Sequence, residues 1–238
     1  MLSKPGVILQ HGLDGPPRRL GDWLRDRELP FEVHPMWEQP PPDPREFSFV
    51  ATLGSESSAA RTDGWVPDEI AMLRDAIAAD VPVLGLCFGG QALSVALGGG
   101  VQTLDRPEVG WIALDVLDPL IPSGRWVQYH FDRIVPPAGA RELARSPVGT
   151  AAFCQGRHLG LQFHAEADAE LVHQWASSDP KLHLSGATVE QLDQQGAEAS
   201  GPALNQAYTL FDRWLEAFVL GRDGASHEVA SATESTAT

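Results

Sequence analysis

Cysteine is scarce in this chain. Only two of its 238 residues are cysteines, Cys87 and Cys154, and the N-terminus lacks the basic segment followed by an apolar one that marks exported proteins. So few cysteines in an unexported chain argue against a fold held together by disulfides. We therefore expect free thiols and a cytoplasmic protein.

Positive charge and long apolar runs are also in short supply. Lys and Arg number 17 against 32 Asp and Glu, which gives a net charge of −15 spread along the chain. Such a surface repels polyanions, so neither nucleic acid nor an anionic membrane is an expected partner. No apolar run reaches the length of a membrane span. Beyond these exclusions, the acidity indicates only a solvated surface.

Apolar residues, by contrast, make up 43% of the sequence, enough to bury one sizeable core. We expect a single domain over residues 1–221. Residues 222–238 are rich in Ser, Thr and Ala, and Val229 is their one large apolar residue. This composition predicts a disordered tail.

Short apolar runs alternate with helical patterns in the first hundred residues. Strands are predicted at 7–10, 31–34, 47–53 and 81–86, and a proline-rich loop at 38–44. Pro67, followed by Asp68 and Glu69, opens the helix after the third strand. The alternation predicts an α/β fold with a doubly wound, mostly parallel central sheet and flanking helices. The ligand site of such a sheet lies beyond the carboxyl ends of its strands.

Beyond Gly100 the pattern turns mainly to strands. They are predicted at 109–117, 125–134 and 150–163, with a hairpin at Gly156-Arg157, so an antiparallel hairpin region should accompany the sheet. Asp168 is expected to cap a helix. Residues 177–201 are polar and poorly patterned, which predicts a loop with one short helix. Apolar residues at helical spacing predict a closing helix: Leu204, Tyr208, Phe211, Leu215 and Phe218.

The stretch Gly85-Leu86-Cys87-Phe88-Gly89-Gly90 joins an apolar strand to a helix. Glycines two residues before and after the cysteine allow the sharp turn of a nucleophile elbow, which pushes one side chain out at the sheet's carboxyl edge. The helix N-terminus would stabilise a thiolate there, and the amide of Phe88 would point toward an oxyanion. The alternative is that Cys87 is a small core residue, but a core cysteine needs no such turn.

A nucleophilic thiolate needs a base, and the base needs a group that orients it. His164-Ala165-Glu166 follows an apolar strand and can supply both, with Glu166 holding the imidazole as an aspartate does in a serine triad. By itself this pair is a weak signal, which a surface histidine beside a helix start would also give. Cys154, His158 and His173 offer no tightly spaced set of zinc ligands, so no metal site is predicted.

Together these segments resemble the class I glutamine amidotransferases, particularly stand-alone members similar to the amidotransferase domain of GMP synthase. Residues 85–91, GLCFGGQ, resemble the family's nucleophile motif, and residues 160–166, GLQFHAE, resemble its histidine–glutamate block. Residues 52–56, TLGSE, occupy the place of its oxyanion loop. The resemblance covers residues 7–220 and implies a flavodoxin-like fold of the amidotransferase type.

The resemblance implies a catalytic triad in which Cys87 is the nucleophile, His164 the base and Glu166 its orienting group. Backbone amides would form the oxyanion hole at Gly54, Ser55 and Phe88. No cofactor or metal is implied.

The resemblance also implies substrate contacts. Gln91, on the first turn of its helix, would contact glutamine, and the backbone around three further residues would hold the amino-acid end: Tyr129, His130 and Phe131. A purely structural hydrogen-bonding role is equally open for His130. His11 and Asp14 would lie at the edge of the site by topology, where ordinary loop polarity also accounts for them.

The oxyanion loop departs from the family pattern. It usually reads glycine-glycine-proline, but here it reads Gly54-Ser55-Glu56. Serine can still donate its amide, although it resists positive φ, so the loop can sit differently. A carboxylate at Glu56 must point away from a developing oxyanion. Ala165 also stands where proline is commonest, which leaves the neighbouring pair intact.

These residues predict a cysteine-dependent amidohydrolase or amidotransferase. We expect it to hydrolyse the side-chain amide of glutamine through a thioester and to pass ammonia to a separate synthase or ligase subunit. Two alternatives stay open: a stand-alone γ-glutamyl hydrolase or peptidase with the same triad, and a non-catalytic binding subunit. The intact triad argues against the second alternative, and the altered oxyanion loop keeps the first open.

Overall fold

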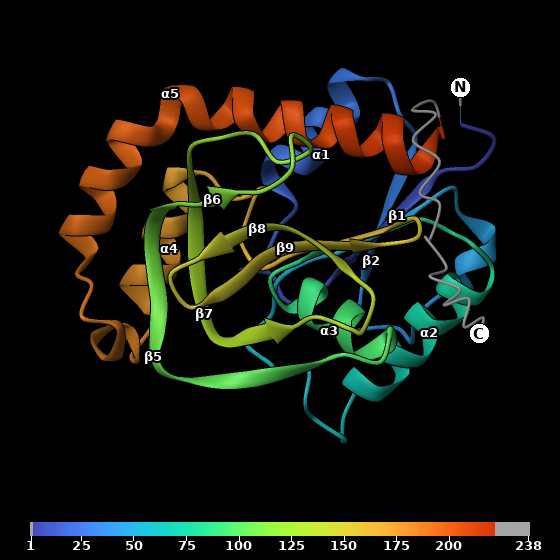
Figure 1. The fold of residues 1–238 in the computed structure, drawn as a ribbon, viewed down its shortest axis with the longest axis horizontal. Coiled ribbons are helices and arrows are strands. Elements are labelled where there is room, and N and C mark those ends of the chain that lie inside the picture. Colours follow the sequence, from blue (N-terminus) through green and yellow to red (C-terminus); the bar gives the residue numbers. More distant parts are fainter. Residues whose placement is uncertain (1, 222–238) are drawn as a thin grey trace, which may run out of the picture.

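The computed structural model describes residues 2–221, without the side chain of Ser200, and the tail predicted over 222–238 lies outside the described residues. Its centre is an eight-stranded sheet in the order β2-β1-β3-β4-β10-β9-β8-β6 (Figure 1). The strands are β1 (Gly6–Gln10), β2 (Phe31–Pro35), β3 (Val50–Thr52), β4 (Val83–Leu86), β6 (Asp115–Val116), β8 (Arg141–Ser146), β9 (Gly149–Gln155) and β10 (His158–Leu161). β2, β1, β3, β4 and β10 are parallel, and the other pairings are antiparallel.

The parallel half follows directly from its sequence. Every residue of β1, β3 and β4 is buried. A strand with helices on both faces has no solvent side, so it reads as a nearly continuous apolar run rather than an alternating one. The predicted doubly wound, mostly parallel sheet is confirmed.

The hairpin region is confirmed with different bounds. β9 and β10 pair through the two-residue loop Gly156-Arg157, with His158 opposite Gln155. β5 (Gly100–Ala113) and β7 (Arg125–Val135) form a separate two-stranded antiparallel sheet, and β5 begins well before the predicted strand. β8 was not predicted, because only Leu143 and Ala144 of its six residues are buried and the apolar signal is too short.

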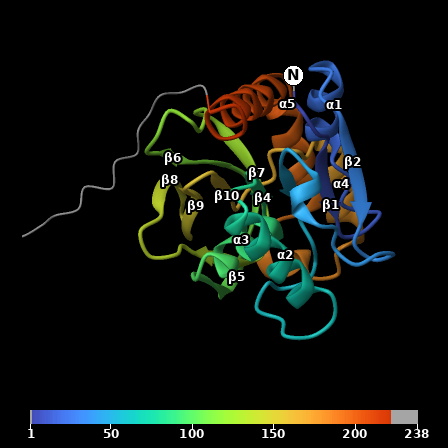
Figure 2. The same cartoon turned by 90° about the vertical axis from the view of Figure 1, so that its right-hand side faces the viewer.

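Helices cover both faces of the sheet (Figure 2). α1 (Arg18–Asp26) and α5 (Val189–Trp214) pack on one face, where Trp23 and Trp214 are fully buried. α2 (Val66–Ala78) and α3 (Phe88–Ala96) pack on the other face through apolar residues such as Leu73 and Phe88. α4 (Ala169–Ser178) packs against the first half of α5, and Asp168 caps it as predicted. Within residues 2–221, no helix combines the length and apolarity needed to cross a bilayer.

The prediction of a loop with one short helix over residues 177–201 is wrong. A 3₁₀ turn covers Leu182–Ser185, and α5 begins at Val189, where Thr188 and Gln191 form a capping box. The first half of α5 buries few apolar side chains, and several of them are alanines. The helical periodicity of large apolar residues in its sequence is therefore weak. The predicted closing stripe is partly wrong as well, since Leu204 is 44% exposed and α5 continues through Pro202.

The carboxyl ends of the parallel strands bring distant segments to one edge. β1 ends at Gln10, β3 at Thr52, β4 at Leu86 and β10 at Leu161. The residues that follow these ends include His11, Gly54, Cys87 and His164. This edge is therefore the place where the predicted site residues meet.

Candidate active site

Cys87 stands on a strained turn between β4 and α3. Its φ is 52° and its ψ is −108°, a region that a residue with a Cβ rarely occupies. The turn brings neighbouring backbone segments so close that only glycine fits beside it: a Cβ on Gly85 would lie 2.4 Å from the carbonyl oxygen of Gly89. Cys87 is 5% exposed at the sheet edge. The local geometry is that of a nucleophile elbow.

His164 and Glu166 form a buried pair beside this turn. β10 is the parallel neighbour of β4, with Leu161 opposite Leu86, so the chain after β10 emerges next to Cys87. The Nδ1 of His164 lies 2.7 Å from Oε1 of Glu166. The ring is packed at 4.8 Å between centroids against Trp175 of α4. Both the direction and the tilt of the imidazole are thereby fixed.

The charge state of His164 is set by its neighbours. Burial lowers its pKa, but the negative charges of Cys87 and Glu166, together with hydrogen bonds to both, outweigh burial and raise the pKa well above 6.5. An imidazolium is therefore held beside the cysteine sulfur. A cationic neighbour of this kind is typical of the surroundings of nucleophilic cysteines.

The backbone amides at all three predicted oxyanion positions are free to act as donors. Within residues 2–221, none of the Gly54, Ser55 and Phe88 amides donates a hydrogen bond. Gly54 lies against the triad residues, since a Cβ there would be 2.7 Å from Cε1 of His164 and 3.7 Å from Cβ of Cys87. Donors at this position suit an oxyanion that develops on a carbonyl attacked by Cys87.

Of the β7 residues predicted to bind substrate, Tyr129 contacts Cys87 through its backbone. The carbonyl oxygen of Tyr129 is 3.9 Å from Sγ of Cys87, and its hydroxyl donates to Oδ2 of Asp179 at 3.0 Å. Burial, and then Asp179, raises the pKa of the Tyr129 phenol. Phe131 lies under the ammonium of Lys181, 5.8 Å from the ring centroid.

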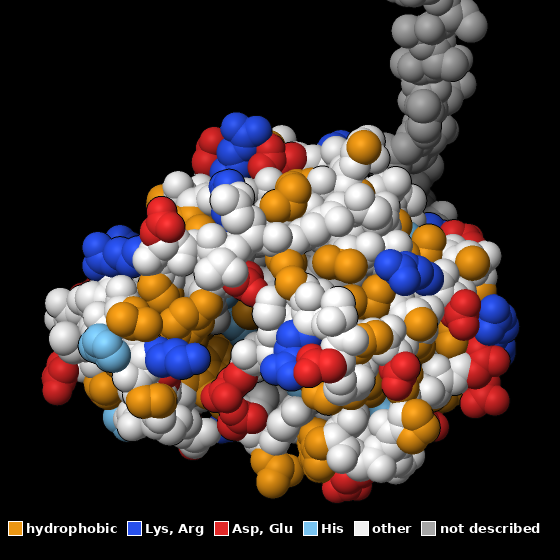
Figure 3. Space-filling model, turned by 90° about the horizontal axis from the view of Figure 1, so that it is seen from below, with side chains coloured by type: hydrophobic (Ala, Val, Ile, Leu, Met, Phe, Trp, Pro, Cys, Tyr) orange, Lys and Arg blue, Asp and Glu red, His pale blue; other side chains and the backbone are white. Residues whose placement is uncertain are grey.

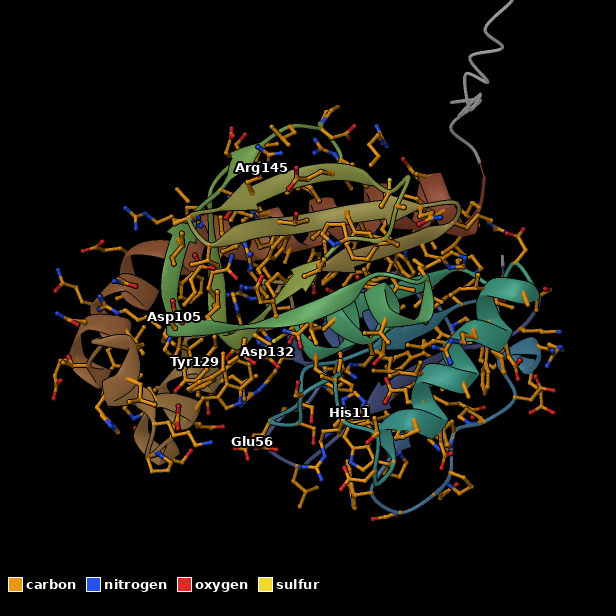
Figure 4. The ribbon with its side chains drawn as sticks, turned by 60° about the horizontal axis from the view of Figure 1, so that its bottom comes forward. His11, Glu56, Asp105, Tyr129, Asp132 and Arg145 are labelled. Atoms are coloured by element: carbon orange, nitrogen blue, oxygen red, sulfur yellow. The ribbon has the colours of Figure 1, made fainter. Side chains whose placement is uncertain are left out.

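Figure 4 shows Tyr129 on β7 and Glu56 on the loop after β3 at the same side of the molecule. Seen from below, acidic side chains gather beside a hollow in this surface (Figure 3). Glu56 is exposed, so its carboxylate reaches water rather than the buried donors.

Gln91 and His130 are engaged with the protein itself. The Gln91 side chain is 3% exposed and donates to the carbonyl oxygen of Asp132 at 2.9 Å. His130 is also buried, with Nδ1 2.9 Å from that same oxygen and Nε2 3.0 Å from Glu108. These are the bonds of a structural hydrogen-bonder, one of the two roles open for His130. Both side chains support the β7 backbone at Asp132.

Sequence reasoning missed Trp175, Asp179 and the partner of His11. The helical pattern places Trp175 on an apolar stripe, and nothing in such a pattern distinguishes a core face from a face that packs on a catalytic ring. Glu69 reads as an ordinary first-turn acid, yet it is fully buried and faces His11 at 2.8 Å. Its position on the apolar face of α2, three residues after Val66, is a signal that could have found it.

Metal binding finds no support in the described part of the chain. Among residues 2–221, no three His, Cys, Asp or Glu side chains converge in a way that could hold a metal ion.

Comparisons with known proteins agree with this geometry. The family model of the class-I glutamine amidotransferases matches residues 54–174. The GMP synthase (glutamine-hydrolyzing) of Aeropyrum pernix is 33% identical over 140 residues, which are 52% of this chain and 27% of that protein. A glutamine-hydrolyzing GMP synthase subunit of Sulfolobus acidocaldarius is 34% identical over 113 residues, 43% of this chain and 57% of that one. The chain thus spans between about a quarter and just over half of these relatives.

A solved structure extends the likeness over nearly the whole chain. The glutamine amidotransferase of Methylobacillus flagellatus superposes with a TM-score of 0.83 and 27% identity, covering 90% of this chain and 95% of that one. The family match, which holds both the elbow and the His164–Glu166 pair, falls within this common fold. The chain therefore belongs to the class-I glutamine amidotransferase family.

Proposed function

We propose that this chain hydrolyses the side-chain amide of glutamine through a thioester on Cys87. The observation that carries the proposal is the strained elbow at Cys87 beside the buried His164–Glu166 pair, in a member of a glutamine amidotransferase family. The chemistry needs a nucleophile, a proton carrier and oxyanion donors, and one candidate for each lies at this edge of the sheet.

The first half-reaction forms the thioester. The Cys87 thiolate attacks the amide carbon, the new C–S bond pushes an electron pair onto oxygen, and the amides of Ser55 and Phe88 stabilise that oxyanion, with Gly54 shaping the loop. The oxyanion then collapses and the C–N bond breaks. His164 gives its Nε2 proton to the departing nitrogen, which leaves as ammonia.

The second half-reaction releases glutamate. His164, now neutral, takes a proton from water as the water oxygen attacks the thioester carbon. Collapse of the second oxyanion breaks the C–S bond and restores the thiolate beside an imidazolium. Glu166 holds the Nδ1 proton throughout, so the Nε2 side of the ring stays turned toward the sulfur.

The ammonia goes, on this proposal, to a separate synthase or ligase subunit in the cytoplasm. The relative from Sulfolobus acidocaldarius is itself named as one subunit of a GMP synthase. Tyr129, Phe131 and Gln91 are proposed to form the wall that holds the amino-acid end of glutamine, Gln91 through the β7 backbone that it supports. A second candidate, a γ-glutamyl hydrolase, is favoured by the exposed Glu56 at the position usually held by proline.

Glutamate release from glutamine and from γ-glutamyl dipeptides tests the proposal, because glutamate is the product common to both hydrolyses, whereas only glutamine also yields ammonia. We expect Cys87→Ser to abolish release and Cys154→Ser to retain it, because Cys154 is a buried β9 thiol whose pKa is raised by burial. Wild-type rates in Cys87→Ser would refute the thioester route. The substrate with the larger kcat/KM decides between the two candidates.

The expected partner has a test of its own. If Ser55 holds the oxyanion loop in an unproductive turn until a partner binds, Ser55→Gly should raise glutamine hydrolysis by the isolated chain, since glycine lifts the restriction on φ. The increase in kcat should not exceed the contribution of one oxyanion donor to catalysis, which is about 10²–10³-fold. High wild-type turnover that the substitution leaves unchanged would favour an independent hydrolase.

A further inference from the structure

A buried chain of hydrogen bonds runs behind the oxyanion loop. The hydroxyl of Thr52 donates to Oε1 of Glu69 at 2.5 Å, and Oε2 of Glu69 lies 2.8 Å from Nε2 of His11. The other ring nitrogen of His11, Nδ1, lies 3.0 Å from the carbonyl oxygen of Gly54. The side chains of His11 and Glu69 are 1% and 0% exposed. His11 thus ties α2 to the loop that carries Ser55 (Figure 4).

The bond between His11 and Gly54 fixes one proton of this hydrogen-bond chain. A carbonyl oxygen only accepts hydrogen bonds, so Nδ1 of His11 carries a proton and donates it to Gly54. At Nε2 one proton lies between the ring and the Glu69 carboxyl, on either the nitrogen or the oxygen. The pair is neutral overall in both cases, and the bond to Gly54 is the same.

That bond fixes the orientation of one peptide plane. A trans peptide points its C=O and its N–H in opposite directions, and no cis peptide occurs within residues 2–221. With the Gly54 carbonyl turned toward His11, the Ser55 amide points to the opposite side of the loop. Gly54 itself lies against the triad, because a Cβ there would be 2.7 Å from Cε1 of His164 and 3.7 Å from Cβ of Cys87.

The ring of His11 is itself held in place. It stacks on Trp65 with 4.7 Å between centroids and 15° between planes, and it meets the edge of Phe88 at 5.0 Å. Phe88 also supplies a free amide of the site. One side chain is therefore in contact with both parts of the proposed oxyanion hole, through the Gly54 carbonyl on one side and the Phe88 ring on the other.

We propose that His11 is a positioning residue that keeps the Ser55 amide turned toward the reacting carbonyl. The role matters here because Gly54 has no Cβ to restrict its backbone, so the orientation of the Gly54–Ser55 peptide plane depends on contacts such as the one with His11. The inference rests on the proposed function, since it needs an oxyanion to stabilise. His11 does not touch the substrate.

Two substitutions separate this role from simple packing. The side-chain nitrogen of asparagine reaches the place of Nδ1, whereas that of glutamine reaches the place of Nε2. We expect His11→Gln, which loses the bond to Gly54, to lower kcat by about 10²-fold, toward the value of one oxyanion donor, with KM changed less than about threefold. His11→Asn should recover at least about tenfold of that loss. Glu69→Gln, which can still contact Thr52 and Nε2, is the matched control and should stay near wild type.

Alkylation of Cys87 by iodoacetamide supplies an independent readout. This reaction forms no oxyanion, so its rate should be unchanged in His11→Gln and His11→Asn if the thiolate pair is intact. Equal kcat in His11→Gln and wild type, equal losses in the two His11 variants, or slowed alkylation would each overturn the positioning role. If His11→Gln does not fold, a loss beyond about a hundredfold in a folded His11→Asn overturns it as well. Wild-type turnover that survives Cys87→Ser refutes the proposed function, whereas a Cys87-dependent turnover indifferent to His11→Gln refutes the positioning role alone.

Discussion

Replacing Gly54 with alanine should displace either the His164 ring or the oxyanion loop. The added Cβ would lie 2.7 Å from Cε1 of His164, whereas ordinary Cβ contacts begin at 3.4 Å. Either the ring or the loop must therefore move by about 0.7 Å. The ring is held by Glu166 and Trp175, so the displacement is shared between the base and the oxyanion loop.

A displacement of this size affects the reaction far more than the fold. Misplacing reacting groups by about 1 Å lowers rates by about 10²-fold, so we expect kcat of Gly54→Ala to fall by roughly 30- to 100-fold. Steady-state ammonia release from glutamine is the assay, with thermal unfolding as a check on folding. Gly15→Ala is the matched control, because its Cβ would meet the Gly54 carbonyl at an ordinary 3.7 Å. A folded Gly54→Ala with wild-type kcat would refute the contact between Gly54 and His164, and equal losses in both variants would refute the distance argument.

Three further predictions concern other residues. Brief treatment with a glutamine-like electrophile should label Cys87 far faster than Cys154, whose pKa is raised by burial, and mass spectrometry of the peptides shows which thiol reacted. His164→Ala should lower kcat by about 10²–10⁴-fold and more than Glu166→Gln, which still offers the ring a hydrogen-bonding partner; near-wild-type turnover in His164→Ala would remove it from the triad. Burial lowers the pKa of His158 to about 4, so the unfolded chain binds more protons below pH 6.5. The free energy of unfolding should then fall by up to about 3 kcal/mol as the pH is lowered from 6.5 to 4. Chemical denaturation at several pH values should show that this decrease is missing in His158→Leu.

The elbow and its strand could be predicted because their signal is local. An apolar run followed by Gly85, Cys87 and Gly89 describes the strand, the turn and the helix start within a few residues. The proximity of His164 to Cys87 was harder to predict, because it depends on the pairing of β10 with β4 and the two residues are 77 positions apart in the sequence. The residues alone gave this pairing only as a weak signal, and the resemblance to a family strengthened it.

The misses have physical causes of a different kind. The first half of α5 escaped prediction because it packs mainly through alanines and a few larger apolar residues, and helical periodicity is read from large ones. The partnership of His11 with Glu69 escaped because both lie beside apolar runs, where polar letters resemble loop or cap residues. Their bond joins the end of β1 to the start of α2, 58 residues apart.

The pairing of β10 between β4 and β9 has a consequence for the order of events during synthesis. The cysteine leaves the ribosome 77 residues before the histidine, and at about 5–20 residues per second that interval lasts roughly 4 to 15 s. Through that time β4 lacks its neighbour and the thiol lacks the imidazolium that would activate it. If His164 activates Cys87 as proposed, a nascent chain, or one that ends before β10, carries a thiol that is not activated. Amide hydrolysis would then begin only after the strand bearing the base has been inserted into the sheet.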